Sequence, residues 1–230
     1  RAQKIRERAI EMGFYAANMP EDLGGGGLDC VSLSLVEREL GRANFALQYL
    51  VGRPSNILQA CVGEQRDHYL FPCIRGEKTD CLAMTEPGAG SDLRSMQCRA
   101  DVDGDDYVIN GTKHFISHAD IADCVILFAA TGEEESARGP RKLISAFLVD
   151  KGTSGFSVRP GYHSVSHRGY HNSILNFDNC RIPKTQMLGA PHQGFNVAND
   201  WLGPTRLQVA AMCLGRAHRA LEHATDWAAE

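Results

Sequence analysis

The chain contains 230 residues, which is enough for between one and two ordinary domains with a substantial buried core. Its 24 lysines and arginines and 28 aspartates and glutamates give a formal net charge of −4. No long run of one sign occurs, which argues against a nucleic-acid-binding protein or one that reads an acidic membrane surface. Hydrophobic residues make up 43%, and the longest apolar run, Cys124 to Ala130, is far too short to span a bilayer. The composition predicts a soluble globular protein without a membrane span.

The first 79 residues carry helical patterns. Apolar residues recur at helical spacing over 1–13, and a second helix is expected over 29–41, with an aspartate in the N-cap position. Four consecutive glycines at 24–27 separate the two as a flexible turn. Pro54 stands where a further helix would begin its first turn. The chain starts without methionine or an N-cap, so we expect residues to precede Arg1.

Residues 80–190 change to short β-rich runs bounded by turn residues. The dipeptides Asp103-Gly104 and Asn110-Gly111 predict two tight hairpins, and residues 132–140 predict a charged loop. Closely spaced strands with such turns are typical of an antiparallel β domain, barrel-like or sandwich-like. The expected strands are Cys81–Thr85, Met96–Val102, Tyr107–Ile109, Lys113–Ser117, Cys124–Thr131, Ile144–Val149, Phe156–Val158 and Ser173–Phe177.

After Pro191 the helical period returns. A leucine and alanine stripe predicts a helix that starts near Pro204 and reaches Glu230 without a stop signal. We therefore expect this helix to continue in residues that follow. The resulting fold class is α+β and multidomain, with a truncated helical N-terminal domain at 1–79, a middle β domain at 80–190, and the first helix of a truncated C-terminal helical domain at 191–230.

Eight cysteines occur singly, with no closely spaced pair that would suggest a zinc site. They are expected to be reduced and mostly buried thiols of a cytosol-like compartment, although their even number leaves disulfides as an alternative. His163, His167 and His171 lie four residues apart, a spacing that could bind a metal on a helix. The neighbouring Gly161 and Gly169 indicate an extended or looped segment instead, so no metal site is expected.

The segment Thr85-Glu86-Pro87-Gly88-Ala89-Gly90-Ser91-Asp92 follows a predicted strand. Its two glycines allow a ligand to approach the backbone, and hydroxyls stand at its two ends on Thr85 and Ser91. Leu93 occupies the third glycine position of a dinucleotide fingerprint, and no phosphate-loop lysine follows. The segment is either a ligand loop or an ordinary Pro-Gly turn.

Phe115 and Ser117 share one face of the strand expected at 113–117. An aromatic ring beside a hydroxyl suits a flat heteroaromatic ligand, although an ordinary half-buried strand has the same pattern. Arg206 stands in the first turn of the expected final helix, where the helix dipole disfavours a cation. It therefore points to an anionic or carbonyl partner, with a plain surface arginine as the alternative.

Three segments in order and register resemble the acyl-CoA dehydrogenase family of flavoproteins, and the resemblance covers essentially the whole chain. The segments are 83–92 (AMTEPGAGSD), 109–117 (INGTKHFIS) and 177–183 (FDNCRIP). The resemblance implies a helical domain, a β domain and a C-terminal helical bundle, with FAD between the last two. It also implies a homotetramer or homodimer.

The resemblance assigns roles to individual residues. Ser117 matches a threonine whose hydroxyl faces flavin N5, Phe115 matches a tryptophan beside the ring, and Ser91 would reach both the flavin phosphate region and the pantetheine arm of the substrate. Arg206 would bind substrate. The implied cofactor-binding residues are Leu82, Met84, Thr85, Gly90, Ser91, Phe115, Ile116 and Ser117.

Two positions depart from the family pattern. Gly203 replaces an aspartate that holds the pantetheine chain in several members, and Thr205 stands where a minority of members place the catalytic glutamate. The base is therefore expected beyond Glu230, and no catalytic residue is assigned.

The implied reaction is α,β-desaturation of an acyl-CoA thioester, with hydride transfer to flavin N5 and an electron-transfer flavoprotein as acceptor. A flavin oxidase or monooxygenase and a non-catalytic member of the same fold are the alternatives. A bacterial cytoplasmic location is expected ahead of the mitochondrial matrix.

Overall fold

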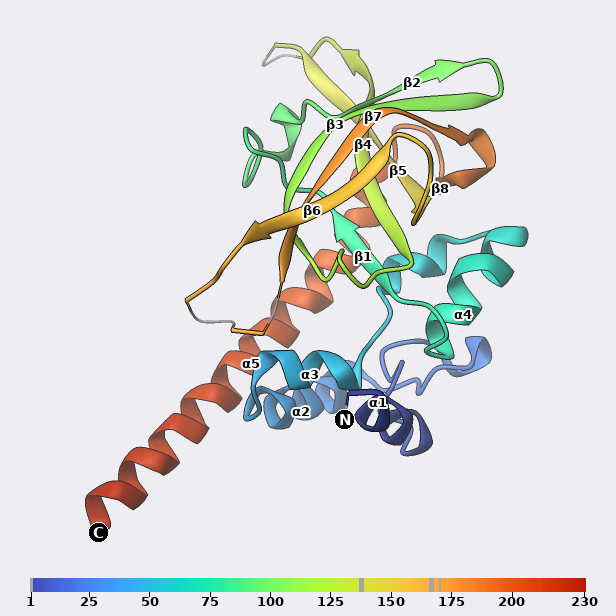
Figure 1. Ribbon diagram of the computed structural model, residues 1–230. Helices are drawn as coiled ribbons and strands as arrows, with labels where there is room; N and C mark the ends of the chain where they lie inside the picture. Colours follow the sequence, from blue (N-terminus) through green and yellow to red (C-terminus); the bar gives the residue numbers. More distant parts are fainter. Residues whose placement is uncertain (1, 137–138, 166–167, 170) are drawn as a thin grey trace.

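The computed structural model describes residues 2–136, 139–165, 168–169 and 171–230. Short helices from the first third of the chain gather at one end of the molecule, and a curled sheet forms the other end (Figure 1). One long helix, α5, runs past both and carries the C-terminus away from the body of the protein. This arrangement agrees with the predicted α+β class. The proposed domain limits at 79 and 190 stay a prediction.

The helical end is built from short elements with clear local causes. Asp29 accepts a hydrogen bond from the Ser32 N–H at 2.7 Å, and so caps α2 as predicted. The helix expected from Pro54 is wrong, because Pro54 precedes only a short 3₁₀ helix that begins at Asn56. The elements are α1 (Ala2–Glu11), η1 (Glu21–Leu23), α2 (Cys30–Gly41), α3 (Phe45–Val51), η2 (Asn56–Ala60), the π-helix η3 (Arg66–Leu70) and α4 (Phe71–Ile74).

The sheet has eight strands in the order β6-β7-β3-β2-β4-β5-β8, with β1 paired to β4. Most neighbours are antiparallel as predicted, but β1 and β2 each pair with β4 in parallel, so the sheet is mixed. Residues 124–130 of β4 and 144–149 of β5 are buried without alternation, which places both faces of these strands in the core. The strands are β1 (Asp80–Ala83), β2 (Arg99–Asp103), β3 (Asp106–Ser117), β4 (Cys124–Glu134), β5 (Arg141–Asp150), β6 (Phe156–Tyr162), β7 (Asn172–Pro183) and β8 (Met187–Leu188), with 3₁₀ turns at η4 (Leu93–Ser95) and η5 (Lys184–Gln186).

The two predicted hairpins have different outcomes. Asp103 pairs with Asp106 across a two-residue turn, which confirms the first. The second is wrong, because β3 runs straight through Asn110-Gly111 and pairs with β7 on both sides of a bulge there. A Cβ at Gly111 would lie 2.6 Å from Cα of Cys98, so the glycine serves close backbone approach instead of a turn.

The final helix α5 (Gly194–Ala229) begins ten residues before the expected start, with Pro204 inside it. Proline offers no N–H to the carbonyl one turn earlier, which is that of Asp200. The side-chain amide of Asn56 donates to this carbonyl at 3.3 Å and replaces the missing donor. A contact from a distant segment thus allows the helix to continue through Pro204.

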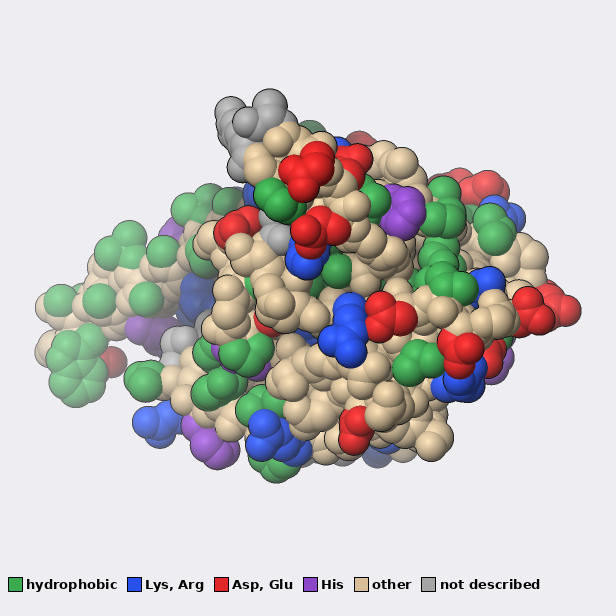
Figure 2. Space-filling model, turned by 90° about the horizontal axis from the view of Figure 1, so that it is seen from above, with side chains coloured by type: hydrophobic (Ala, Val, Ile, Leu, Met, Phe, Trp, Pro, Cys, Tyr) green, Lys and Arg blue, Asp and Glu red, His purple; other side chains and the backbone are tan. Residues whose placement is uncertain are grey.

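The helices α2 and α5 cross with almost no separation between their backbones. A Cβ on Gly41 would collide with the Met212 carbonyl, and one on Gly215 would collide with the Arg38 carbonyl. Beyond the crossing, the outer part of α5 exposes large apolar side chains, among them Leu214, Leu221 and Trp227. Figure 2 shows hydrophobic side chains along the protruding arm of the molecule.

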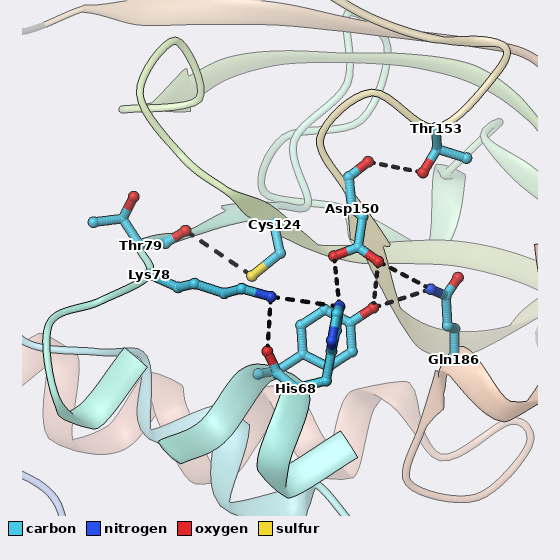
Figure 3. A network of polar contacts seen from close by, with 8 residues as sticks. His68, Lys78, Thr79, Cys124, Asp150, Thr153 and Gln186 are labelled. Atoms are coloured by element: carbon cyan, nitrogen blue, oxygen red, sulfur yellow. Dashed lines mark hydrogen bonds and ion pairs between the residues drawn. The ribbon is translucent and has the colours of Figure 1, made fainter. Parts of the chain in front are cut away.

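A polar network joins the helical end to the sheet (Figure 3). At the end of β5, the Asp150 carboxylate accepts hydrogen bonds from Tyr69 at 2.9 Å and Gln186 at 3.3 Å. Asp150 Oδ1 also lies 3.3 Å from His68 Nε2. The backbone carbonyl of His68 accepts a hydrogen bond from Lys78 Nζ at 2.9 Å. These contacts hold η3 against the end of β5.

All eight cysteines are free thiols, and six of them are buried. Acidic and basic side chains are interspersed on the face seen in Figure 2, without a large patch of one sign. Within the part of the chain that the structure describes, no helix combines the length and the apolarity needed to cross a membrane.

Candidate functional site

The loop after β1 is closed on itself. The backbones of Glu86 and Ala89 exchange two hydrogen bonds, at 2.9 and 3.2 Å, around Pro87 and Gly88. Residues Gly88 and Gly90 are exposed, and a Cβ at either would meet no atom within 4 Å. The loop therefore presents an open backbone surface, which a loop that binds a ligand through its backbone requires.

A buried ion pair holds this loop to β3. Lys113 Nζ lies 2.7 Å from Glu86 Oε1 and donates to the Met84 carbonyl at 3.1 Å. The Glu86 carboxylate also accepts the backbone N–H groups of Gln97 at 2.6 Å and Cys98 at 3.0 Å. Burial lowers the pKa of Lys113. Sequence reasoning missed this pair, since its partners are far apart in sequence and each sits in a motif interpreted for its neighbours.

The backbone of β3 bulges just after Lys113. The His114 N–H donates to the Thr85 carbonyl at 3.0 Å, and Phe115 takes a left-handed φ of 56°. That conformation is costly for an aromatic residue, and such strain gathers at functional sites. It turns the Phe115 ring outward, half exposed and stacked on Tyr162 at 4.2 Å between centroids. Tyr162, on β6, also hydrogen-bonds His114 Nδ1 at 3.1 Å.

The bulge thus brings several of the predicted site residues together. Thr85 and Phe115 are linked through the His114 hydrogen bond, whereas the side chains of Met84 and Ile116 are buried in the core. Those two side chains can reach a ligand only through neighbouring backbone groups.

The other predicted residues lie on exposed surfaces or along a cavity. Gly90 and Ser91 are on the exposed part of the loop. Arg206 is exposed on the fourth turn of α5, not in its first turn, so the helix-dipole argument for this residue no longer holds. Leu82 and Ser117 line a cavity between the helical end of the molecule and the sheet.

A cavity in two adjoining parts lies between the N-terminal helices, α5 and the sheet, and we name it the helix–sheet cavity. Its larger part, about 420 Å³, lies between α2, α3, α5 and the end of β3. A smaller part of about 170 Å³ adjoins it and reaches β1. Both parts are lined by Asn18, Arg53, Ser117, His118, Trp201 and Thr205. The cavity therefore lies between the helices, β1 and the end of β3, with Ser117 on its wall.

Charged groups on the cavity wall are paired or shifted in pKa. Arg53 forms an ion pair with Glu37, which also accepts from Gln48 Nε2 at 3.2 Å. Burial lowers the pKa of Arg53 to about 10 and that of His118 to about 4, and it raises the pKa of Asp80 to about 6. At neutral pH the His118 ring is therefore uncharged.

The histidines of the 163–171 segment do not assemble a metal site in the described residues. His171 Nδ1 lies 2.8 Å from Asp120 Oδ2, and His167 falls outside the described residues. No group of three His, Cys, Asp or Glu side chains with metal-binding geometry occurs in the described part of the chain.

Comparison with known proteins places these features in a family. Models of the N-terminal, middle and C-terminal domains of acyl-CoA dehydrogenase match residues 2–77, 81–180 and 192–230. The 3-(aryl)acrylate reductase of Clostridium sporogenes is 34% identical over 98% of this chain and 60% of its own length. The human mitochondrial short-chain specific acyl-CoA dehydrogenase is 34% identical over 94% of this chain and 53% of its own length. The CarC subunit of the caffeyl-CoA reductase-Etf complex of Acetobacterium woodii is 34% identical over 99% of this chain and 60% of its own length.

Solved structures agree. A putative acyl-CoA dehydrogenase from Mycobacterium smegmatis superimposes with a TM-score of 0.86 at 30% identity, over 99% of this chain and 60% of that one. An acyl-CoA dehydrogenase from Bacillus anthracis complexed with FAD gives a TM-score of 0.82 at 30% identity, over 96% of this chain and 38% of that one. The chain spans 53–60% of the length of the three curated relatives named above. Matches along nearly all of it, in the family's domain order, show that it belongs to the acyl-CoA dehydrogenase family.

Proposed function

We propose that this chain is the flavin- and acyl-binding part of an FAD-dependent acyl-CoA dehydrogenase. The observation that carries the proposal is the attachment of the Thr85–Asp92 loop to β3, just before its bulge, by Glu86 and Lys113, together with a cavity that Ser117 of β3 lines. The loop, the outward ring and the cavity are three features that such an enzyme needs at one place. The matching family models and the FAD-bound relative support it.

The residues present suit a flavin. Gly88 and Gly90 leave open space over the loop backbone, and Phe115 offers a half-exposed ring face. We propose that Thr85, Gly90, Ser91, Phe115 and Ser117 hold FAD directly, with Leu82 beside them and with Met84 and Ile116 contributing backbone groups. When bound, FAD would supply the oxidant for α,β-desaturation, in which the acyl group loses its β hydrogen as hydride and its α proton to a base.

The acyl group would enter the helix–sheet cavity, where Trp201 and Thr205 of α5 face the end of β3 across it. Enclosure there excludes water from the reacting carbons. Ser91 and Arg206 are proposed to contact the pantetheine arm outside the cavity. No carboxylate here is assigned as the base: on the cavity wall, Glu37 is bound to Arg53 and Gln48, and Asp80 accepts the Ser55 backbone N–H.

The electron acceptor and the direction of the reaction are proposed from the names of the relatives. One relative is named as a subunit of a reductase-Etf complex, so an electron-transfer flavoprotein is the proposed partner. Two relatives are named as reductases, which makes reduction of an unsaturated acyl group the second candidate activity. A homotetramer or homodimer is proposed from the resemblance. A cytoplasmic location ahead of the mitochondrial matrix stays a prediction.

The test is an anaerobic absorption titration of the full-length gene product with acyl-CoA thioesters. A bound flavin whose absorption bleaches with a saturated thioester supports dehydrogenation. A dithionite-reduced flavin that regains absorption only with an unsaturated thioester supports the reductase. Reduced flavin that reoxidises rapidly in air supports an oxidase or monooxygenase, and a protein that binds no FAD contradicts the proposal.

A further inference from the structure

The walls of the helix–sheet cavity combine aromatic rings with buried polar atoms, which is an unusual environment for a plain alkyl chain. The Tyr49 and His118 rings lie parallel, with centroids 3.2 Å apart and planes 15° apart, and both line the cavity. Trp201, Phe14 and Phe45 complete the aromatic wall. A cavity of about 420 Å³ is within the range that holds a small organic ligand. Flat walls of this kind favour a ring that can stack or pack edge-on.

Two buried polar atoms of residues that line the cavity have no partner among the described residues: Asn18 Oδ1 and Ser55 Oγ. Leaving such an atom buried and unbonded costs about 1–3 kcal/mol. The Asn18 amide nitrogen donates to the Pro54 carbonyl at 2.9 Å, and this contact fixes which end of the amide is free. An amide oxygen can only accept, so the group that satisfies Asn18 must be a donor.

The charges around the cavity disfavour a carboxylate. Arg53 is the one arginine or lysine among the described residues that line it, and Glu37 already neutralises it. His118 is neutral near pH 7, since its pKa is lowered to about 4. Asp80 lies on the wall beside Ser55 and accepts the Ser55 backbone N–H at 3.2 Å. A second carboxylate would meet no unpaired cation here and would be repelled by Asp80.

We propose that the acyl group held in the helix–sheet cavity is aromatic and carries a hydroxyl on its ring. The ring packs against Tyr49, His118 and Trp201, and the hydroxyl donates to Asn18 Oδ1 and contacts Ser55 Oγ. This inference rests on the proposed function, because it assumes that the cavity takes the acyl part of a thioester. It adds the substrate class, which that function leaves open.

The experiment compares five thioesters on the FAD-loaded full-length protein: p-hydroxyphenylpropionyl-CoA, phenylpropionyl-CoA, butyryl-CoA, octanoyl-CoA and glutaryl-CoA. Flavin bleaching under anaerobic conditions and kcat/KM with an artificial electron acceptor are measured, together with the Kd of each thioester by calorimetry. One neutral hydrogen bond made only by the hydroxylated substrate corresponds to about a tenfold preference over phenylpropionyl-CoA. We expect p-hydroxyphenylpropionyl-CoA to have a lower Kd and a higher kcat/KM than phenylpropionyl-CoA. The alkyl and carboxylated thioesters should have higher Kd and lower kcat/KM values than both.

Two variants test the assignment to individual atoms. Ser55→Ala removes a buried hydroxyl that bonds to nothing in the described chain, so the variant should be at least as stable to heat as the parent. It should lower the preference for the hydroxylated ring over the plain ring severalfold, and Asn18→Leu should abolish that preference. Ser157→Ala, an exposed serine on β6 outside the cavity, is the matched control and should leave the preference intact.

The outcomes separate the two proposals. Bleaching by butyryl-CoA or octanoyl-CoA in preference to the aromatic thioesters overturns the substrate class and leaves the dehydrogenase function standing. Preference for glutaryl-CoA, or a hydroxyl preference that survives in both variants, also overturns it. A protein without bound FAD overturns both.

Discussion

Lys113 and Glu86 form an ion pair of 2.7 Å whose side chains are 0% and 3% exposed, and this pair joins the two segments that make the candidate site. Lys113 lies directly before the bulged residues of β3, and Glu86 lies within the glycine-containing loop. The pair therefore positions the loop relative to Phe115 and Ser117. Its effect on a ligand is indirect, through the placement of both segments.

Replacing Lys113 with methionine should destabilise the protein by about 3–5 kcal/mol, because the Glu86 carboxylate would stay buried without its cation. The free energy of unfolding in urea measures this change. Lys142→Met is the matched control, since Lys142 pairs with Glu133 at the surface and its loss should cost about 1 kcal/mol or less. Equal effects of the two substitutions would contradict a structural role for the buried pair.

Gly90 should tolerate a side chain in the free protein but not with cofactor bound. A Cβ there meets no atom of the chain within 4 Å, so Gly90→Ala and Gly90→Val should keep the melting temperature of the apoprotein. If FAD lies against this backbone, its Kd should rise in the order Gly, Ala, Val, by tenfold or more for valine. Flavin fluorescence quenching measures the Kd. An unchanged Kd in both variants would place the flavin elsewhere.

His118 should make stability depend on pH between about 6.5 and 4. Burial lowers its pKa from 6.5 to about 4, partly opposed by Asp120 and assisted by His171. Within that window the unfolded chain binds a proton that the folded chain does not, so this contribution is complete above pH 6.5 and is lost as the pH falls. The loss amounts to at most about 3 kcal/mol.

Asp80 acts in the opposite direction, because its raised pKa of about 6 gives the folded chain the extra proton below that pH. The measurement is therefore the difference between the parent and His118→Asn, which leaves Asp80 in place. Asparagine tolerates the left-handed φ of 60° at this position. The stability advantage of the parent over the variant should shrink on acidification from pH 7 to pH 4.5; a difference that does not change with pH would refute the shift.

Gly215→Ala should separate α2 from α5, because the new Cβ would collide with the Arg38 carbonyl. We expect a loss of several kcal/mol, as for other substitutions that overpack a tight contact. Gly203→Ala on the same helix is the matched control, with no atom within 4 Å of its Cβ, and should stabilise α5 by about 0.5–1 kcal/mol. Thermal unfolding of both variants separates the effect of alanine's helix propensity from the effect of the collision at the α2–α5 crossing. If both substitutions raised the melting temperature, the close crossing would not limit the residue at position 215.

The sequence by itself determined features that depend on neighbouring residues. The Asp29 cap and the Asp103-Gly104 hairpin are examples, because a cap or tight turn is decided by a few adjacent side chains. The three motif segments were also sufficient to recognise the family. Residue type and spacing within each segment carry that signal without any knowledge of contacts.

The tertiary structure decided what depends on distant partners. Asn110-Gly111 lies in a strand because pairing with β7 and close approach to Cys98 outweigh the local turn preference. The helix α5 passes Pro204 because Asn56 satisfies the carbonyl that proline leaves free. The helix–sheet cavity, with its paired Arg53 and unbonded Asn18, exists only where N-terminal helices, β3 and α5 meet. Such features arise from contacts between residues far apart in the chain, which local residue patterns do not encode.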